Sequence, residues 1–234
     1  MPVWSIEGIP GVGKTTVLAQ IKQIKAICGN PVIVLDEPID QWKEVVDKNN
    51  TPLFDLFYKD PVAHGFAFQM LALITRVHLL KQAVRWHPDA YIFTERCPSS
   101  DKVFAEMLFM NGSITLEQYT VYNKAWNLLD NIPIAGVIYL RADPAFALGR
   151  CLSRGREGES LTLDYLQQCN ELHEKWVYTL PFKCLILDSS TTTQALVSSI
   201  LKFLKPSESP VYIFDFLVAL WVVAVLAMGI FLFF

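Results

Sequence analysis

Residues 8–15 read G-I-P-G-V-G-K-T, and they lie between a short apolar run at residues 3–6 and a helical pattern. In the spacing G-x-x-x-x-G-K-T, glycines let the backbone wrap around a phosphate group and point its N–H groups inward. The following helix adds the positive end of its dipole. We expect Lys14 to bridge the β- and γ-phosphates and the Thr15 hydroxyl to bind Mg²⁺. The stretch therefore predicts a P-loop that binds a nucleoside triphosphate.

The predicted triphosphate-binding residues of this loop are Gly8, Gly11, Val12, Gly13, Lys14, Thr15 and Thr16. A regulatory GTPase would also need an N-K-x-D sequence to read guanine. Residues 123–126 read N-K-A-W, without the aspartate. The loop therefore predicts nucleotide binding, and the rest of the chain must indicate what is phosphorylated.

Five short apolar runs rich in β-branched residues predict buried strands, at residues 3–6, 31–35, 90–94, 136–140 and 184–187. Helical periodicity fills the stretches between them, at residues 15–27, 62–86, 99–110, 116–129 and 163–179. Strands that alternate with helices are typical of a parallel sheet covered on both faces. We therefore expect an α/β three-layer sandwich with a five-stranded parallel sheet, in a domain that spans residues 1–205.

Composition excludes several classes of protein. The formal net charge of −3 gives no bulk basicity for nucleic-acid binding. The five cysteines are odd in number and form no C-x-x-C pair, so the sequence predicts neither a disulfide framework nor a zinc site. A reducing compartment fits this cysteine pattern best, and the N-terminus lacks the pattern of a secretory signal.

A second segment is predicted at the C-terminus. Residues 206–210, broken by two prolines, are interpreted as a linker, and residues 211–234 form an apolar tail. Residues 216–234 carry no charge and approach the length of a helix that spans a bilayer. The alternative is a buried core helix, which the absence of an amphipathic face disfavours. We expect a transmembrane tail that anchors a cytosolic catalytic domain.

Charged residues cluster after the predicted strands, where α/β sheets bind ligands. Glu37 is placed to accept the proton of an attacking hydroxyl, and Glu95 to complete a Mg²⁺ shell. Arg150, Arg154 and Arg156 are candidates to close over the triphosphate, and the first two share a helix face. Each residue also has an ordinary interpretation, as a strand end or a solvated helix face.

These motifs resemble the deoxynucleoside kinase family over roughly residues 3–190. The resemblance is carried by S-I-E-G-x-x-x-x-G-K-T from Ser5, E-P-x-x-x-W from Glu37, Phe68-Gln69, Glu95-Arg96 and R-x-x-x-R-G-R from Arg150. It implies ATP as phosphate donor, Mg²⁺, and a role in nucleotide salvage for DNA synthesis. The chain departs from the family at Cys97, where serine is common, within the P-loop interior, and in the apolar tail.

The resemblance implies a role for each matching residue. Glu37 matches the base that acts on the 5′-hydroxyl, and Arg96 the arginine near the 5′-oxygen. Arg150, Arg154 and Arg156 match the arginines of the lid. The predicted catalytic residues are Glu37, Arg96, Lys14, Arg150 and Arg154, and Arg154 and Arg156 are also predicted to bind ATP. For the nucleoside, Trp42 matches an aromatic wall of the pocket, Phe68 the ring that stacks on the base, and Gln69 the amide that pairs with the base edge. Tyr58 and Glu159 match the groups that hold the 3′-hydroxyl, and the positions for base selection match Ala72, Arg76 and Asp101.

An Arg76–Asp101 pair favours deoxycytidine, because a carboxylate accepts a hydrogen bond from an exocyclic amine, with thymidine as the other candidate. A thymidylate-type monophosphate kinase is an alternative, although Asp36 and Glu37 would repel an acceptor phosphate. A membrane-tethered nucleotide-binding protein without catalysis is another. The expected partners are the nucleoside, ATP and a membrane, and a homodimer is left open.

Overall fold

The computed structural model describes residues 3–129, 132–156 and 159–205. The chain divides into two compact units, Met1–Lys202 and Phe203–Phe234, and the description below concerns the first. The predicted linker at 206–210, the apolar tail at 211–234 and the membrane anchor built on it lie outside the described residues.

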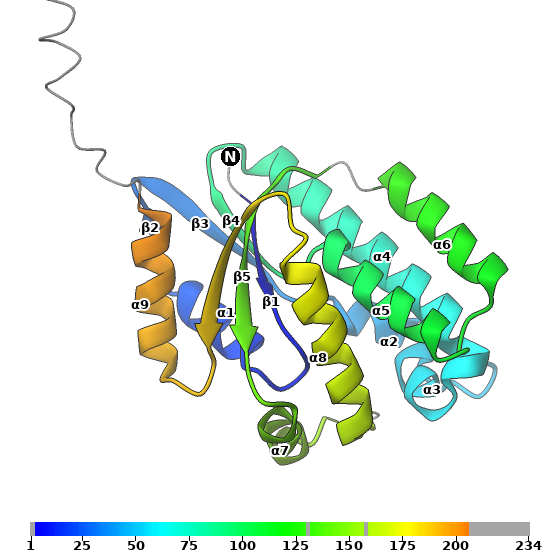
Figure 1. Cartoon of the computed structure of the whole chain (residues 1–234). Coiled ribbons are helices and arrows are strands. Elements are labelled where there is room, and N and C mark those ends of the chain that lie inside the picture. Colours follow the sequence, from blue (N-terminus) through cyan, green and yellow to red (C-terminus); the bar gives the residue numbers. More distant parts are fainter. Residues whose placement is uncertain (1–2, 130–131, 157–158, 206–234) are drawn as a thin grey trace, which may run out of the picture. The chain divides into compact units, whose positions relative to one another are not determined.

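The first unit is built on a sheet of six strands in the order β2-β3-β4-β1-β5-β6 (Figure 1). The strands are β1 (Val3–Glu7), β2 (Ala26–Ile27), β3 (Asn30–Leu35), β4 (Tyr91–Glu95), β5 (Ile134–Arg141) and β6 (Lys183–Asp188). Neighbouring strands from β3 to β6 pair in parallel, as the five apolar runs predict. The three-layer α/β class is therefore confirmed.

The strand count was predicted wrongly at one edge of the sheet. A helix was expected over residues 15–27, but α1 ends at Ile21, and Ala26–Ile27 pairs antiparallel with Asn30–Pro31. Cys28 and Gly29, both with positive φ (49° and 84°), make the two-residue turn between these strands. Such a turn matches the twist of a hairpin, which the helical periodicity of the stretch conceals.

Helices cover both faces of the sheet (Figure 1). α1 lies on one face, and α4, α5 and α8 lie on the other, with α6 packed outside α4 and α5. The helices are α1 (Lys14–Ile21), α2 (Ile39–Glu44), α3 (Leu53–Lys59), α4 (Pro61–Trp86), α5 (Pro98–Met110), α6 (Leu116–Leu129), α7 (Pro144–Arg154), α8 (Leu163–Val177) and α9 (Thr193–Leu204).

Several helices begin with the same local signal, a cap residue followed by proline. Asp60 accepts a hydrogen bond from the Ala63 N–H before Pro61, and Asp143 caps α7 before Pro144 in the same way. Proline at the first helical position loses no hydrogen bond, because its N–H would have no partner in the helix. These signals fix where α4 and α7 start, and therefore which residues reach the cavity described below.

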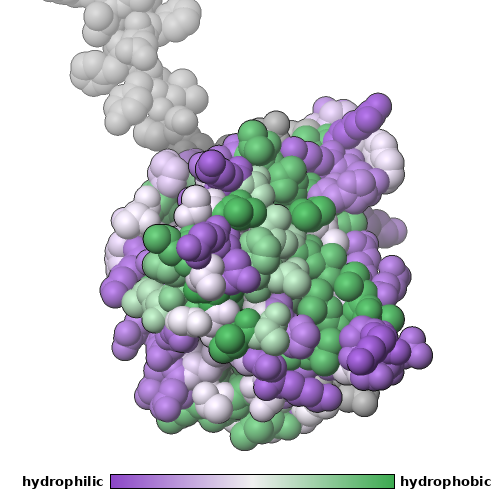
Figure 2. All heavy atoms as spheres, turned by 90° about the vertical axis from the view of Figure 1, so that its right-hand side faces the viewer, coloured by the Kyte–Doolittle hydropathy of each residue, from purple (hydrophilic) through white to green (hydrophobic). Residues whose placement is uncertain are grey.

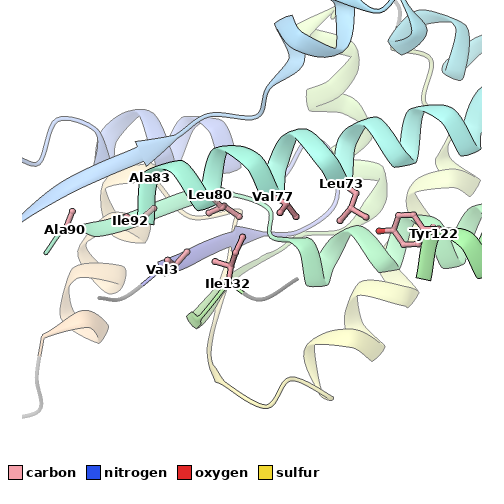
Figure 3. Close-up of a cluster of buried hydrophobic side chains, with 10 residues drawn as sticks. Val3, Leu73, Val77, Leu80, Ala83, Ala90, Ile92, Tyr122 and Ile132 are labelled. Carbon is pink, nitrogen blue, oxygen red and sulfur yellow. The ribbon is translucent and has the colours of Figure 1, made fainter. Parts of the chain in front are cut away.

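The main core lies between α4 and the sheet (Figure 3). Leu73, Val77 and Leu80 of α4 are spaced as one helix face, and they pack in a buried cluster with Val3 of β1 and Ile92 of β4. In the described part of the chain, α4 alone has the length and hydropathy of a membrane span. Its packing on the sheet and its buried Arg76 are those of a core helix.

The face that contains α4 and α6 carries exposed apolar side chains among charged ones (Figure 2). The exposed apolar side chains of these two helices include Ile74 of α4 and Val121 and Leu128 of α6. The homodimer stays a prediction.

Candidate active site

The P-loop lies between β1 and α1, and its glycines are required by close backbone contacts. Gly8 and Gly11 both have positive φ (134° and 86°). A Cβ atom would lie 2.4 Å from the Leu140 carbonyl oxygen at Gly8 and 2.2 Å from the Ala147 carbonyl oxygen at Gly11. Only glycine fits both the conformation and the space, so these residues hold the loop against β5 and α7.

Lys14 is buried at the start of α1, with its ammonium group turned back over the loop. Its Nζ donates to the carbonyl oxygens of Gly8 and Ile9, both at 3.2 Å, and lies 3.7 Å from Oε1 of Glu95. Burial and then the positive charge of Arg96 lower the pKa of Lys14 to about 8, and Glu95 opposes this shift. The cation is therefore held beside oxygen atoms, in the place where the loop would receive a phosphate.

Thr15 and Glu95 fit a magnesium site. The Thr15 hydroxyl donates to Oε2 of Glu95 at 2.8 Å, so two hard oxygen ligands lie together at the end of β4. Mg²⁺ commonly takes only one or two protein oxygens and completes its shell with phosphates and water. No cluster of three His, Cys, Asp or Glu side chains that would suit another metal occurs within the described residues.

Glu37 follows β3 and lies among buried cations. Its Oε1 accepts a hydrogen bond from Nη2 of Arg76 at 3.1 Å and lies 3.8 Å from Nε of Arg96. The other terminal nitrogen of Arg76 pairs with Oδ1 of Asp101, so one guanidinium joins the two carboxylates. Burial raises the pKa of Asp101, and the charge of Arg76 opposes that shift. Arg76 thus links the predicted base-selecting residue to the predicted general base.

An aromatic cluster forms the adjoining wall. Phe68 stacks on Phe57 with ring centroids 4.6 Å apart and meets Trp42 edge-on at 5.3 Å. The Trp42 indole N–H donates to Thr75, which fixes the ring. Gln69 donates its amide to the Asp101 backbone carbonyl at 3.1 Å, which orients the amide beside Asp101. A flat, apolar slot with polar groups at one edge suits a nucleobase.

Tyr58 and Glu159 lie in the same region, and the lid arginines hold Glu159. Arg154 pairs with Oε2 of Glu159, and Nη1 of Arg156 lies 3.7 Å from Oε1. Burial, followed by the charge of Glu159, raises the pKa of Tyr58 above its ordinary value. Gly155 ends α7 in the left-handed conformation and redirects the chain between these two arginines.

Arg150 lies on the P-loop side of α7. Its Nη1 is 3.4 Å from the carbonyl oxygens of both Val12 and Ser189, and its guanidinium stacks on Phe146 at 4.5 Å. Of the lid arginines, Arg150 therefore contacts the P-loop, whereas Arg154 and Arg156 contact the carboxylate of Glu159.

A single cavity of about 530 Å³ brings these parts together. Every predicted site residue except Gly8 lines it, and the Gly8 carbonyl accepts a hydrogen bond from Lys14, which does line it. The structure thus gathers residues from the P-loop, the carboxyl ends of β3 and β4, helices α2 to α5 and α7, and the segment after α7. The geometry allows a phosphate at Lys14 and a planar group against Phe68 within one space.

Comparison with known proteins decides the family. A family model described as deoxynucleoside kinase matches residues 4–211. The chain belongs to the deoxynucleoside kinase family. This kinase is 34% identical over 178 residues to a probable deoxycytidine kinase of fowlpox virus (strain NVSL), covering 74% of this chain and 70% of the viral one. It is 29% identical over 196 residues to the Bos taurus deoxycytidine kinase, covering 74% of each chain.

A solved structure shows the same fold. The deoxyadenosine kinase from M. mycoides superposes on this kinase with a TM-score of 0.73 and 24% identity, covering 86% of this chain and 98% of that one. The family match and the deoxycytidine kinase relatives show that the chain is an enzyme that phosphorylates deoxynucleosides with ATP as donor, and the alternative of a protein without catalysis is set aside.

Sequence reasoning missed several residues of this kinase that surround Arg96. Phe104 and Tyr165 line the cavity, and the Arg96 guanidinium lies 4.4 Å from the centre of the Phe104 ring. Glu7 is fully buried, accepts from the Cys97 N–H at 2.9 Å, and has Oε2 at 4.0 Å from Nη1 of Arg96. His173 of α8 is also fully buried and contacts the same guanidinium. A lone histidine in an amphipathic helix gives no spacing signal for such a contact.

The burial of His173 predicts a loss of stability in acid. Burial lowers the pKa of His173 from 6.5 to about 3, and the charge of Arg96 adds to the shift. Below pH 6.5 the unfolded chain binds a proton that folded His173 refuses, so the stabilisation is complete above 6.5 and is lost as pH falls toward 3. We expect the free energy of unfolding to fall by about 2 kcal/mol, through this group, between about pH 7.5 and pH 5.

Urea unfolding at both pH values measures this effect. His173→Gln should remove that part of the pH dependence, whereas His87→Leu, which changes an exposed histidine, should keep it. An unchanged pH dependence in His173→Gln would show that folded His173 titrates normally.

Proposed function

We propose that this kinase transfers the γ-phosphoryl group of ATP to the 5′-hydroxyl of a deoxyribonucleoside, with deoxycytidine preferred. The observation that supports this proposal is the position of Glu37. Its carboxylate shares one cavity with Lys14, accepts a hydrogen bond from Arg76 at 3.1 Å and lies 3.8 Å from Nε of Arg96. A neutral hydroxyl needs such a base, whereas an acceptor phosphate would be repelled by it.

The chain's own residues divide the work of the transfer. Lys14 and the N–H groups of the P-loop hold the triphosphate, and Glu37 takes the proton of the attacking hydroxyl. Arg96, near Glu37, is placed to offset charge at the 5′-oxygen, and Arg150 and Arg154 at the phosphates. Mg²⁺ held by Thr15 and Glu95 would neutralise negative charge on the phosphates. These roles rest on the contacts described above.

The preference for deoxycytidine rests on acceptors at the edge of the aromatic slot. Asp101 is buried, and its Oδ2 atom has no hydrogen-bond partner among the described side chains and backbone. A free carboxylate oxygen accepts from the exocyclic amine of cytosine and repels the carbonyl oxygen of thymine. Gln69 donates one of its two amide hydrogens to the Asp101 backbone carbonyl, and its amide oxygen is a second acceptor.

A panel of deoxynucleosides tests the substrate directly. With ATP and Mg²⁺, we expect kcat/KM for deoxycytidine to exceed that for thymidine by about 10- to 100-fold, the value of one unpaired polar group in a buried site. Asp101→Asn should narrow this ratio, because an amide can also donate to the thymine carbonyl. Product analysis should place the phosphate on the 5′-oxygen, and deoxycytidine monophosphate should be a poor acceptor. Faster turnover of thymidine, or of the monophosphate, would overturn the proposal.

A further inference from the structure

Arg96 has a strained backbone and a buried side chain, so its orientation is closely constrained. Its φ of 67° lies in the left-handed region, which costs a non-glycine residue free energy. Its N–H donates to the Ile6 carbonyl at 3.2 Å, and its carbonyl accepts from the Thr94 hydroxyl at 3.0 Å. Strain of this kind persists where the surrounding structure needs the side chain in one place.

Two carboxylates compete for the Arg96 guanidinium. Glu37 lies 3.8 Å from Nε on the cavity side, and Glu7 lies 4.0 Å from Nη1 on the buried side. Oε2 of Glu7 has no hydrogen-bond partner among the described residues, so it attracts Nη1 inward. A rotation toward Glu7 would withdraw the guanidinium from Glu37.

His173 holds the atom for which Glu7 competes. Nη1 of Arg96 lies 3.3 Å from Nε2 of His173, and Nδ1 of His173 lies 2.7 Å from the Cys169 carbonyl oxygen. A carbonyl can only accept, so Nδ1 carries the hydrogen, and a guanidinium can only donate, so Nε2 is the acceptor. The partners therefore select one neutral tautomer. We propose that His173 is a positioning residue that holds the Arg96 guanidinium toward Glu37 by accepting a hydrogen bond from Nη1.

The surroundings of His173 favour this fixed, uncharged form. Phe104 meets the imidazole edge-on at 5.3 Å and also stacks on Arg96, so α5 and α8 enclose the pair. Tyr139 of β5 and Trp176 of α8 close the remaining sides. The titratable groups that face the ring are Arg96, Lys14, Cys169 and Tyr139, of which two are cations that oppose its protonation. His173 thus stays an acceptor through the neutral pH range.

Kinetics of two His173 variants test the proposal, which rests on the role proposed for Arg96. His173→Leu removes the acceptor, and we expect kcat to fall about 10- to 100-fold while KM for ATP and deoxycytidine changes much less. His173→Gln offers an amide oxygen near the position of Nε2 and should restore most of the turnover number. His87→Leu, on the exposed end of α4, controls for loss of a histidine. A His173→Leu enzyme with wild-type kcat, or a His173→Gln enzyme as slow as His173→Leu, would overturn it.

A coupling measurement separates positioning from general damage. In an Arg96→Met background, His173→Leu should cost little further activity, because the group that it positions is gone. Equal losses in both backgrounds would refute the proposal. Nitrogen-15 NMR of the wild-type protein should show His173 with Nδ1 protonated and Nε2 unprotonated. The opposite tautomer would refute the proposal, and this test does not depend on whether a variant folds.

Failure of the positioning role can be distinguished from failure of the proposed function by the activity of the wild-type kinase. If the wild-type kinase forms no deoxycytidine 5′-monophosphate, the proposed function fails whatever His173 does. If the wild type forms it and His173→Leu matches its rate, only the positioning role fails.

Discussion

Replacing Glu37 with glutamine should lower kcat by on the order of 10²- to 10⁴-fold, the usual contribution of a general base. The amide has the size of the carboxylate but cannot accept the hydroxyl proton, and it also ends the charge attraction of Arg76 and Arg96. The steady-state rate with saturating ATP and deoxycytidine measures the effect. ATP affinity should change little, because Lys14 and the P-loop remain intact.

Asp36→Asn is the matched control for this experiment. Asp36 directly precedes Glu37, but its carboxylate pairs with Lys22 on the exposed surface. We expect nearly full activity from this variant. A Glu37→Gln enzyme as fast as the Asp36→Asn enzyme would show that another group removes the proton.

Arg76→Met should destabilise the fold by about 3–5 kcal/mol, because it leaves a buried carboxylate without its cation. Asp101 is 2% exposed, and one of its oxygens already has no partner among the described residues. Urea unfolding at neutral pH measures the loss. The double variant Arg76→Met/Asp101→Asn should regain much of the stability but not the activity, since Glu37 has still lost a partner.

Arg141→Met supplies the comparison for this second variant. Arg141 also pairs with a carboxylate, that of Glu174, but the arginine side chain is 42% exposed. Partly exposed pairs contribute about 0–1 kcal/mol, so its removal should have a much smaller effect. If Arg76→Met costs no more than Arg141→Met, then Asp101 becomes neutral at little cost when its partner is gone.

The sequence alone predicted the P-loop and the five parallel strands, because each depends on local spacing. The spacing G-x-x-x-x-G-K-T is by itself typical of a P-loop, and short apolar runs are typical of buried strands. The residues of the nucleoside pocket were instead implied by the resemblance to the deoxynucleoside kinase family. The hairpin at Cys28–Gly29 was missed since helical periodicity continues through it. His173 and Glu7 were missed for a different reason. His173 contacts Arg96 across 77 positions of the chain, and no local pattern encodes such a contact.

The site roles stay predictions, but their shared location has a physical basis. Parallel strands end at the same edge of a sheet, so the segments after β1, β3, β4 and β5 converge there. That rule places Lys14, Glu37, Arg96 and Arg150 together without any knowledge of their partners. The rule does not predict that Arg76 pairs with both Glu37 and Asp101. Those ion pairs depend on the length of the Arg76 side chain and on the rotation of α4 about its axis.

Helix α4 contributes side chains both to the cavity and to the hydrophobic core. Phe68, Gln69 and Arg76 face the cavity, while Leu73, Val77 and Leu80 on the same helix form the core. A mutation in α4 that widens the slot for an unnatural nucleoside analogue can therefore also disturb the packing of this helix on the sheet and lower the stability of the fold. Engineering a new specificity in this protein will therefore require compensating, stabilising changes along that helix.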